Sequence, residues 1–147
     1  MNPAVEHPHT ELVELRIPSR PEWVALGRLA AATVANRLRF SIEEIEDVKL
    51  AVAEAFTAVI QHEGHGEFID MTCEALSDLL RIRVRDSGRQ GVARAQAQAP
   101  NMNFDEARIA GLGVFLIRTL MDEVSYDVSP QGTDLVMVKR LTGATDQ

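Results

Sequence analysis

The stretch GLGVFLIRTLMDEV at residues 111–124 decides the fold, because it joins two glycines directly to a helix. Gly111 and Gly113 stand at the start of a set of apolar residues that recur at helical spacing. These residues are Leu112, Phe115, Leu116, Leu120 and Met121. Glycines at a helix N-terminus expose backbone N–H groups, which together with the helix dipole can hold phosphate oxygens. A flexible hinge at the helix entry is the alternative interpretation, since the stretch lacks the lysine of a P-loop.

The whole chain has the size and composition of one globular domain. It contains 147 residues, of which 46% are apolar and 25% are charged, close to the average for soluble domains. We expect a flexible tail over residues 1–10, a single domain over residues 11–141 and a short tail over residues 142–147.

Charge, apolar runs and cysteine content restrict the setting of the protein. The net charge is −7 and there is no run of Lys or Arg, which argues against direct binding to nucleic acid. No apolar run is long enough to span a membrane, and the N-terminus lacks the basic and apolar segments of a secretion signal. Cys73 is the single cysteine and cannot form an internal disulfide, which together with the missing secretion signal favours a cytoplasmic protein. Cys73 lies on the apolar face of a predicted strand, so we expect it to be a small core residue.

The N-terminal half predicts a strand followed by two helices. Apolar and polar residues alternate over 11–17, which predicts a half-buried strand. A capping box at residues 19–22 then predicts a helix of about 19 residues. A second capping box at residues 41–44 opens another helix, which Gly64 and Gly66 end.

The C-terminal half predicts strands, a long loop and the helix already described. The strands are expected at residues 69–75, 80–85, 124–128 and 133–141. Periodicity is absent from residues 87–110, a stretch far longer than an ordinary connection, and such loops are commonly lids or binding loops. This order of elements favours an α+β two-layer sandwich, with one mostly antiparallel sheet and helices on one face.

Asp86 stands where a strand ends, and Ser87 and Gly88 follow it. Its carboxylate can accept a hydrogen bond from an exocyclic amine. Gly88 has no side chain, so a planar base can lie against the backbone there. An ordinary turn after a strand is the alternative interpretation.

Glu54 lies on the second helix, outside its apolar stripe. It shares a face with Ala58, Gln61 and His62, which follow at offsets of one and two turns. A carboxylate in this position can accept a proton or position a nucleophile. A solvated helix face is the alternative interpretation.

Taken in order, these motifs resemble those of the anti-sigma-factor serine kinases, a family of the GHKL superfamily of histidine-kinase-like ATPases. The helix at residues 47–62 is similar to the family's N box, and Asp86-Ser87-Gly88 to its G1 box. Residues 111–124 are similar to its G2 segment, and residues 132–137 to the strand whose threonine helps to hold adenine. The resemblance covers residues 11–141 and implies the Bergerat-type ATP-binding fold.

The resemblance implies that ATP or ADP binds under a mobile lid, which would be residues 89–110. The nucleotide-binding residues would be Asp86, Gly88, Gly111, Leu112, Gly113 and Thr133. Asp86 and Thr133 would recognise adenine, and Glu54 would be the catalytic base for a serine hydroxyl. The family members phosphorylate a STAS-type antagonist, and otherwise bind an alternative sigma factor, usually as homodimers.

One residue departs from the family's pattern. Ala58 stands where the N box carries the asparagine that ligates Mg²⁺, and a methyl group cannot ligate a metal. Gln61 offers a weak substitute, whereas His62 suits a hard cation poorly. The sequence therefore leaves two hypotheses, an active kinase and a catalytically weak module that acts by partner exchange. A sensor-linked ATPase module is a third hypothesis, but the chain shows no second domain and no phospho-accepting histidine helix.

The remaining polar and aromatic residues have structural interpretations. The four histidines and Cys73 show no metal-binding spacing, so we expect no metal site from them. The arginines of residues 81–85 alternate along a strand and would line its polar face, with an acidic partner as the alternative. We expect Trp23 to be buried or to lie at an interface.

Overall fold

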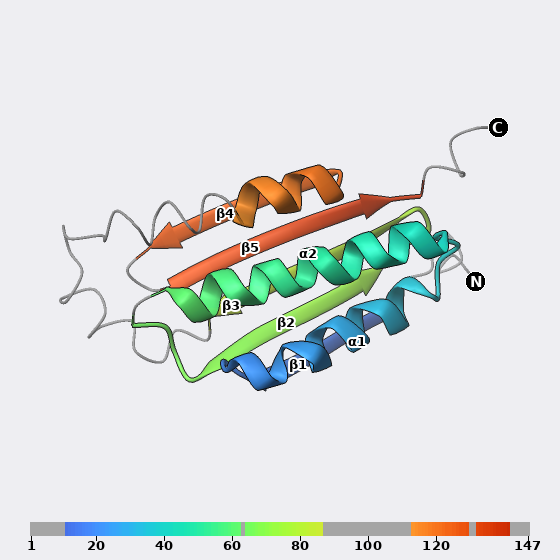
Figure 1. Cartoon of the computed structure of the whole chain (residues 1–147). Helices are drawn as coiled ribbons and strands as arrows, with labels where there is room; N and C mark the ends of the chain where they lie inside the picture. Colours follow the sequence, from blue (N-terminus) through green and yellow to red (C-terminus); the bar gives the residue numbers. More distant parts are fainter. Residues whose placement is uncertain (1–10, 63, 87–112, 130–131, 142–147) are drawn as a thin grey trace, which may run out of the picture.

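The computed structural model describes residues 11–62, 64–86, 113–129 and 132–141. One antiparallel five-stranded sheet carries the helices on one face (Figure 1), which confirms the predicted α+β two-layer sandwich. The labelled elements are β1 (Glu11–Pro18), η2 (Pro21–Trp23), α1 (Val24–Ala35), α2 (Ile42–Gln61), β2 (Phe68–Ala75), β3 (Leu79–Asp86), β4 (Glu123–Ser129) and β5 (Gly132–Arg140). Residues 113–120 are also helical. The predicted tails and the predicted lid lie outside the described residues.

The sheet has the order β1-β2-β3-β5-β4, and every neighbouring pair is antiparallel. Its helix-covered face is apolar and includes the fully buried Ile82 and Leu135. The opposite face carries ion pairs between neighbouring strands, among them Arg83 with Asp134. Hydrogen bonds from Arg83 hold the pKa of the Asp134 carboxyl below its ordinary value. Arg81 is likewise paired, with Glu74, so both arginines line a polar face as predicted.

α2 begins at the predicted capping box. The Ser41 hydroxyl accepts from the backbone N–H of Glu44, and the Glu44 carboxylate accepts from the backbone N–H of Ser41. The helix continues to Gln61, and Gly64 follows with a φ of 81°, a left-handed conformation that suits glycine. The second helix and its end are therefore confirmed.

The first predicted capping box is wrong. Ser19 does not cap a helix, because its hydroxyl donates to the carbonyl oxygen of Gly66, 47 positions away, at 2.5 Å. The chain first forms the short 3₁₀ helix η2, with Pro21 at its start. α1 then covers only 12 residues instead of the predicted 19 or so. Trp23 is 43% exposed and is not buried.

A close contact between helices fixes α1 against α2. A β-carbon at Gly27 would lie 2.7 Å from Cζ of Phe56, nearer than a real side-chain carbon approaches another atom. Phe56 is fully buried, so its ring has little space into which it could move. Only glycine at position 27 permits this packing.

The helix at residues 113–120 packs on the sheet with a different stripe from the predicted one. Val114, Ile117 and Met121 are buried, whereas Phe115 is 67% exposed. The pattern was misassigned because both sets of apolar residues have helical spacing. Lys139 of β5 donates to the carbonyl oxygen of Leu120 at 2.7 Å, which satisfies a carbonyl at the end of this helix.

Two further observations concern the setting of the chain. None of the helices in the described ranges is both long and apolar enough to cross a membrane. Cys73 is buried, and burial raises the pKa of its thiol to about 12. The thiol therefore stays protonated near neutral pH and behaves as the small core residue that we predicted.

Candidate functional site

The candidate residues gather where several elements meet at one end of the sheet. β3 ends there and β5 begins there, and the loop that follows α2 enters β2 at the same end (Figure 1). The helix of residues 113–120 also begins at this end. Segments far apart in the sequence therefore contribute side chains to one region.

Asp86 is the last residue of β3 and is only 3% exposed. Burial alternates along β3, so Asp86 faces the helix layer. The backbone N–H of Gly66 donates to Oδ1 of Asp86 at 2.9 Å. This bond fixes the orientation of a carboxylate that burial would otherwise penalise.

Thr133 lies beside Asp86 on the same face of the sheet. Arg85 is opposite Asp134 in the pairing of β3 with β5, so the next step in this register places Asp86 opposite Thr133. Thr133 is 1% exposed, and its hydroxyl oxygen has no hydrogen-bond partner within the described part of the chain. Buried hydroxyls in folded proteins are normally bonded. This hydroxyl and the neighbouring carboxylate are suited to recognising a polar, planar ligand.

Glu54 and Gly113 form a second part of the site. A β-carbon at Gly113 would lie 3.5 Å from Oε1 of Glu54, so the carboxylate faces the space that a side chain at position 113 would occupy. Glu54 is half-buried on α2. Because position 113 has no side chain, a ligand group at the start of the helix can approach both the backbone and the carboxylate.

The predicted face around Glu54 is not uniform. Ala58 is 6% exposed, Gln61 is exposed, and His62 lies beyond the last helical residue as the C-cap of α2. The methyl group of Ala58 offers no metal ligand. Over the described ranges there is also no group of three His, Cys, Asp or Glu residues that could hold a metal ion. With Ala58 in place of the asparagine, these residues do not fit the Mg²⁺ site that the resemblance implies.

Three other predicted residues lie outside the described ranges. They are Gly88, Gly111 and Leu112. Their assignment to nucleotide binding stays a prediction.

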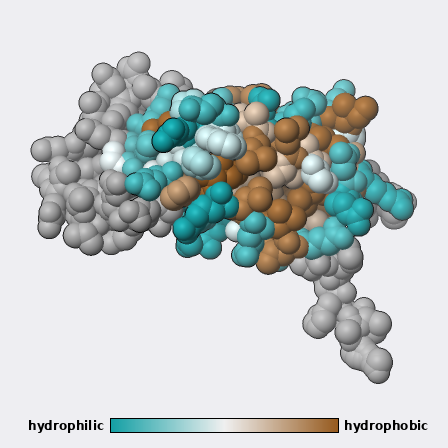
Figure 2. All heavy atoms as spheres, turned by 90° about the horizontal axis from the view of Figure 1, so that it is seen from below, coloured by the Kyte–Doolittle hydropathy of each residue, from teal (hydrophilic) through white to brown (hydrophobic). Residues whose placement is uncertain are grey.

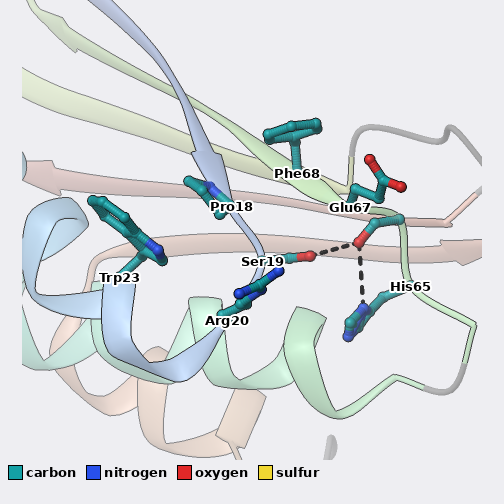
Figure 3. A pocket seen from close by; sticks show the side chains of 8 residues that line it. Pro18, Ser19, Arg20, Trp23, His65, Glu67 and Phe68 are labelled. Carbon is teal, nitrogen blue, oxygen red and sulfur yellow. Dashed lines mark hydrogen bonds between the residues drawn. The ribbon is translucent and has the colours of Figure 1, made fainter.

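Sequence reasoning missed the contribution of Gly66 and Ser19. We interpreted Gly66 as a helix stop and Ser19 as a cap, yet their contacts run to residues 20 and 47 positions away. No local pattern signals such contacts. The two residues also line an open pocket of about 660 Å³ (Figure 3). Its other lining residues are Pro18, Arg20, Trp23, His65, Glu67 and Phe68.

Comparison with known proteins gives one family and several similar relatives. The model of the family described as histidine kinase-like ATPase domain matches residues 17–139. A protein named serine-protein kinase RsbW from Listeria monocytogenes serotype 4a (strain HCC23) is 42% identical over an alignment of 137 positions, which covers 86% of this chain and 85% of the relative.

Two relatives from Bacillus carry the same name. The protein of Bacillus cereus (strain Q1) is 36% identical over an alignment of 140 positions, which covers 88% of this chain and 84% of the relative. The protein of Bacillus subtilis (strain 168) is 33% identical over an alignment of 144 positions, which covers 92% of this chain and 89% of the relative.

Proposed function

Because this chain belongs to the family of histidine kinase-like ATPase domains and is related to the serine-protein kinases named RsbW, we propose that it is an ATP-binding anti-sigma regulator. It holds an alternative sigma factor, and it phosphorylates a serine of a STAS-type antagonist. The position of Glu54 beside Gly113 carries the proposal, because it places a carboxylate near the start of a helix suited to phosphate.

Adenine recognition is proposed for Asp86 and Thr133. An exocyclic amine would donate to the Asp86 carboxylate, which also accepts from the N–H of Gly66. The buried Thr133 hydroxyl lacks a partner within the described residues and is available to the same ligand. The residues present therefore fit a nucleotide base.

Phosphoryl transfer is proposed for the part of the site that contains Glu54. ATP would supply the phosphoryl group. Glu54 would accept the proton of the attacking serine hydroxyl as the new O–P bond forms and the bond to the leaving ADP breaks. Gly113 leaves room beside Glu54, and backbone N–H groups at the start of its helix would hold phosphate oxygens.

Ala58 supports a second candidate function. Without the amide ligand the chain would bind nucleotide but transfer phosphoryl groups poorly, and regulation would run through exchange of partners. The buried methyl group of Ala58 favours this candidate.

Calorimetry with ATP and ADP, with and without Mg²⁺, tests nucleotide binding, and a phosphorylation assay separates the two candidates. The kinase proposal expects ATP binding, together with transfer to a serine of a STAS domain in a phosphorylation assay. Binding without transfer would favour the partner-exchange module. Absence of nucleotide binding would contradict both.

Replacing Ala58 by asparagine is expected to make ATP binding depend more strongly on Mg²⁺. An amide oxygen there would restore a hard ligand, and a gain of about 1.4 kcal/mol corresponds to a tenfold tighter complex in Mg²⁺. The measurement is the ratio of ATP affinities with and without Mg²⁺ in both proteins. An unchanged ratio would show that the missing ligand is not what limits metal binding.

We also propose that the protein forms a homodimer through an edge patch, which consists of Val13, Leu15, Trp23, Leu26 and Ala30. Trp23 is 43% and Leu26 41% exposed, and Val13 and Leu15 are only partly buried although they face the core. Figure 2 views the molecule from the side of α1 and β1 and has hydrophobic residues gathered across it. Such a patch at a sheet edge is typical of an interface.

The backbone and charges of β1 fit a second copy of the chain. β1 is an edge strand. The Ser19 N–H donates to the Glu67 carbonyl, and by antiparallel alternation the backbone groups of Glu14 and Arg16 point away from β2. A twofold axis at Leu15 would place Glu14 opposite Arg16 of the second copy, which pairs opposite charges.

Replacing Leu26 by glutamate is expected to convert the dimer to a monomer, because the interface would then bury an unpaired charge. Size-exclusion chromatography with light scattering measures the mass. Ile42→Glu is the matched control, since Ile42 is 80% exposed and lies outside the edge patch. Equal masses for both variants and the original chain would contradict the proposed interface.

A further inference from the structure

We infer that Ser19 is a positioning residue for the Asp86 carboxylate and acts through the backbone of Gly66. This inference rests on the proposed recognition of adenine by Asp86. Ser19 lies at the junction of β1 and η2, and it has no direct contact with Asp86 in any hydrogen bond of the described residues.

Ser19 holds the segment before β2 at two points. Its backbone N–H donates to the carbonyl oxygen of Glu67 at 2.9 Å, which extends the pairing of β1 with β2 by one residue. Its hydroxyl donates to the carbonyl oxygen of Gly66 at 2.5 Å. Ser19 is 5% exposed, so water competes little for either bond.

Gly66 connects Ser19 to Asp86. Its carbonyl oxygen accepts from Ser19 at 2.5 Å and lies farther, 3.4 Å, from Nδ1 of His65, and its N–H donates to Oδ1 of Asp86 at 2.9 Å. Glycine has the greatest backbone freedom of all residues. The peptide groups before and after Gly66 therefore keep one orientation only if both are hydrogen-bonded. Without the Ser19 hydroxyl, the Gly66 N–H would lose part of its fixed direction, and so would the carboxylate.

Gly66 also borders a pocket that is open to the surface. Gly66 and Ser19 line the pocket of Figure 3, in which the Ser19 side chain points to the Gly66 carbonyl. The Ser19 hydroxyl thus binds the carbonyl group of Gly66 on the side of the pocket, and the Asp86 carboxylate binds the N–H of Gly66. Because Ser19 is outside the base contact, its effect on nucleotide binding can be separated from that of Asp86.

Ser19→Ala tests the inference, since it removes the hydroxyl and keeps the bond from residue 19 to Glu67. We expect ATP binding to weaken about three- to tenfold, the equivalent of one neutral hydrogen bond. Binding of purine riboside triphosphate, which lacks the exocyclic amine, is expected to stay unchanged. An equal loss for both nucleotides would overturn the inference, because it would indicate a general disturbance of the site.

Three control variants accompany the measurement. Ser19→Thr keeps the hydroxyl and is expected to restore ATP affinity. Thr33→Ala removes a hydroxyl that donates to Leu29 within α1, far in the chain from Asp86, and is expected to leave affinity unchanged. In an Asp86→Asn background, Ser19→Ala is expected to have little further effect. Additive losses would contradict a role through Asp86.

Hydrogen exchange at the Gly66 amide separates this inference from the proposed function. Faster exchange in Ser19→Ala than in the original chain is expected, because that amide donates to Asp86. If the original chain fails to bind ATP while exchange accelerates, the nucleotide proposal fails and the link from Ser19 to the carboxylate stands. Unchanged exchange would overturn the link whatever the nucleotide result.

Discussion

Asp86→Asn is expected to weaken ATP binding about 10- to 100-fold, the loss of one hydrogen bond to a charged group. Asparagine keeps an oxygen that can accept from the Gly66 N–H, so we expect the backbone conformation at Gly66 to stay the same. It replaces the negative charge and the second acceptor with an NH₂ group, which would point a donor at the donor of adenine. Calorimetric titration with ATP measures the effect.

Asp134→Asn is the matched control for this variant. Asp134 is one position beyond Thr133 on β5, but it pairs with Arg83 on the other face of the sheet. The substitution makes the same chemical change without touching the proposed base site, and ATP affinity is expected to stay the same. If Asp86→Asn also binds ATP as before, Asp86 does not recognise adenine.

Glu54→Gln is expected to slow serine phosphorylation about 10²- to 10⁴-fold, the usual contribution of a general base. Glutamine has nearly the same shape as glutamate but cannot accept the serine proton. ATP affinity is expected to change little, because the carboxylate lies beside Gly113 and not at the proposed adenine contact. The measurement combines single-turnover transfer from ATP to a STAS domain with calorimetry.

Glu46→Gln serves as the control on the same helix. Glu46 forms an exposed ion pair with Lys49, so its loss is expected to leave the transfer rate near that of the original chain. A Glu54→Gln variant that transfers at the original rate would exclude Glu54 as the base. A variant that loses ATP affinity in parallel would indicate a role for Glu54 in binding.

Local signals in the sequence were sufficient where both partners of an interaction are close in the chain. The capping box of α2 needs only Ser41 and Glu44, and the structure has both of its bonds. The same pattern at Ser19 failed, because a carbonyl 47 positions away competes for the hydroxyl. Tertiary contacts of this kind override local preference and leave no trace in a short window of sequence.

The sequence also indicated part of the candidate site. Motif order indicated Glu54, Asp86, Gly113 and Thr133 as residues of one site. The pairing of β3 with β5, which places Asp86 beside Thr133, is not contained in the spacing of either strand. The role of Gly66 could not be predicted from the sequence, because Gly66 contributes backbone atoms to the site, and every residue except proline carries these in full.

The close approach of Gly27 to Phe56 limits how this domain can diverge or be recombined. The missing β-carbon of one residue accommodates the aromatic ring of the other, with 2.7 Å to an added carbon. The two positions therefore constrain each other during evolution, and a larger residue at 27 requires a smaller one at 56. A chimera that takes α1 from one relative and α2 from another has to transfer both positions together.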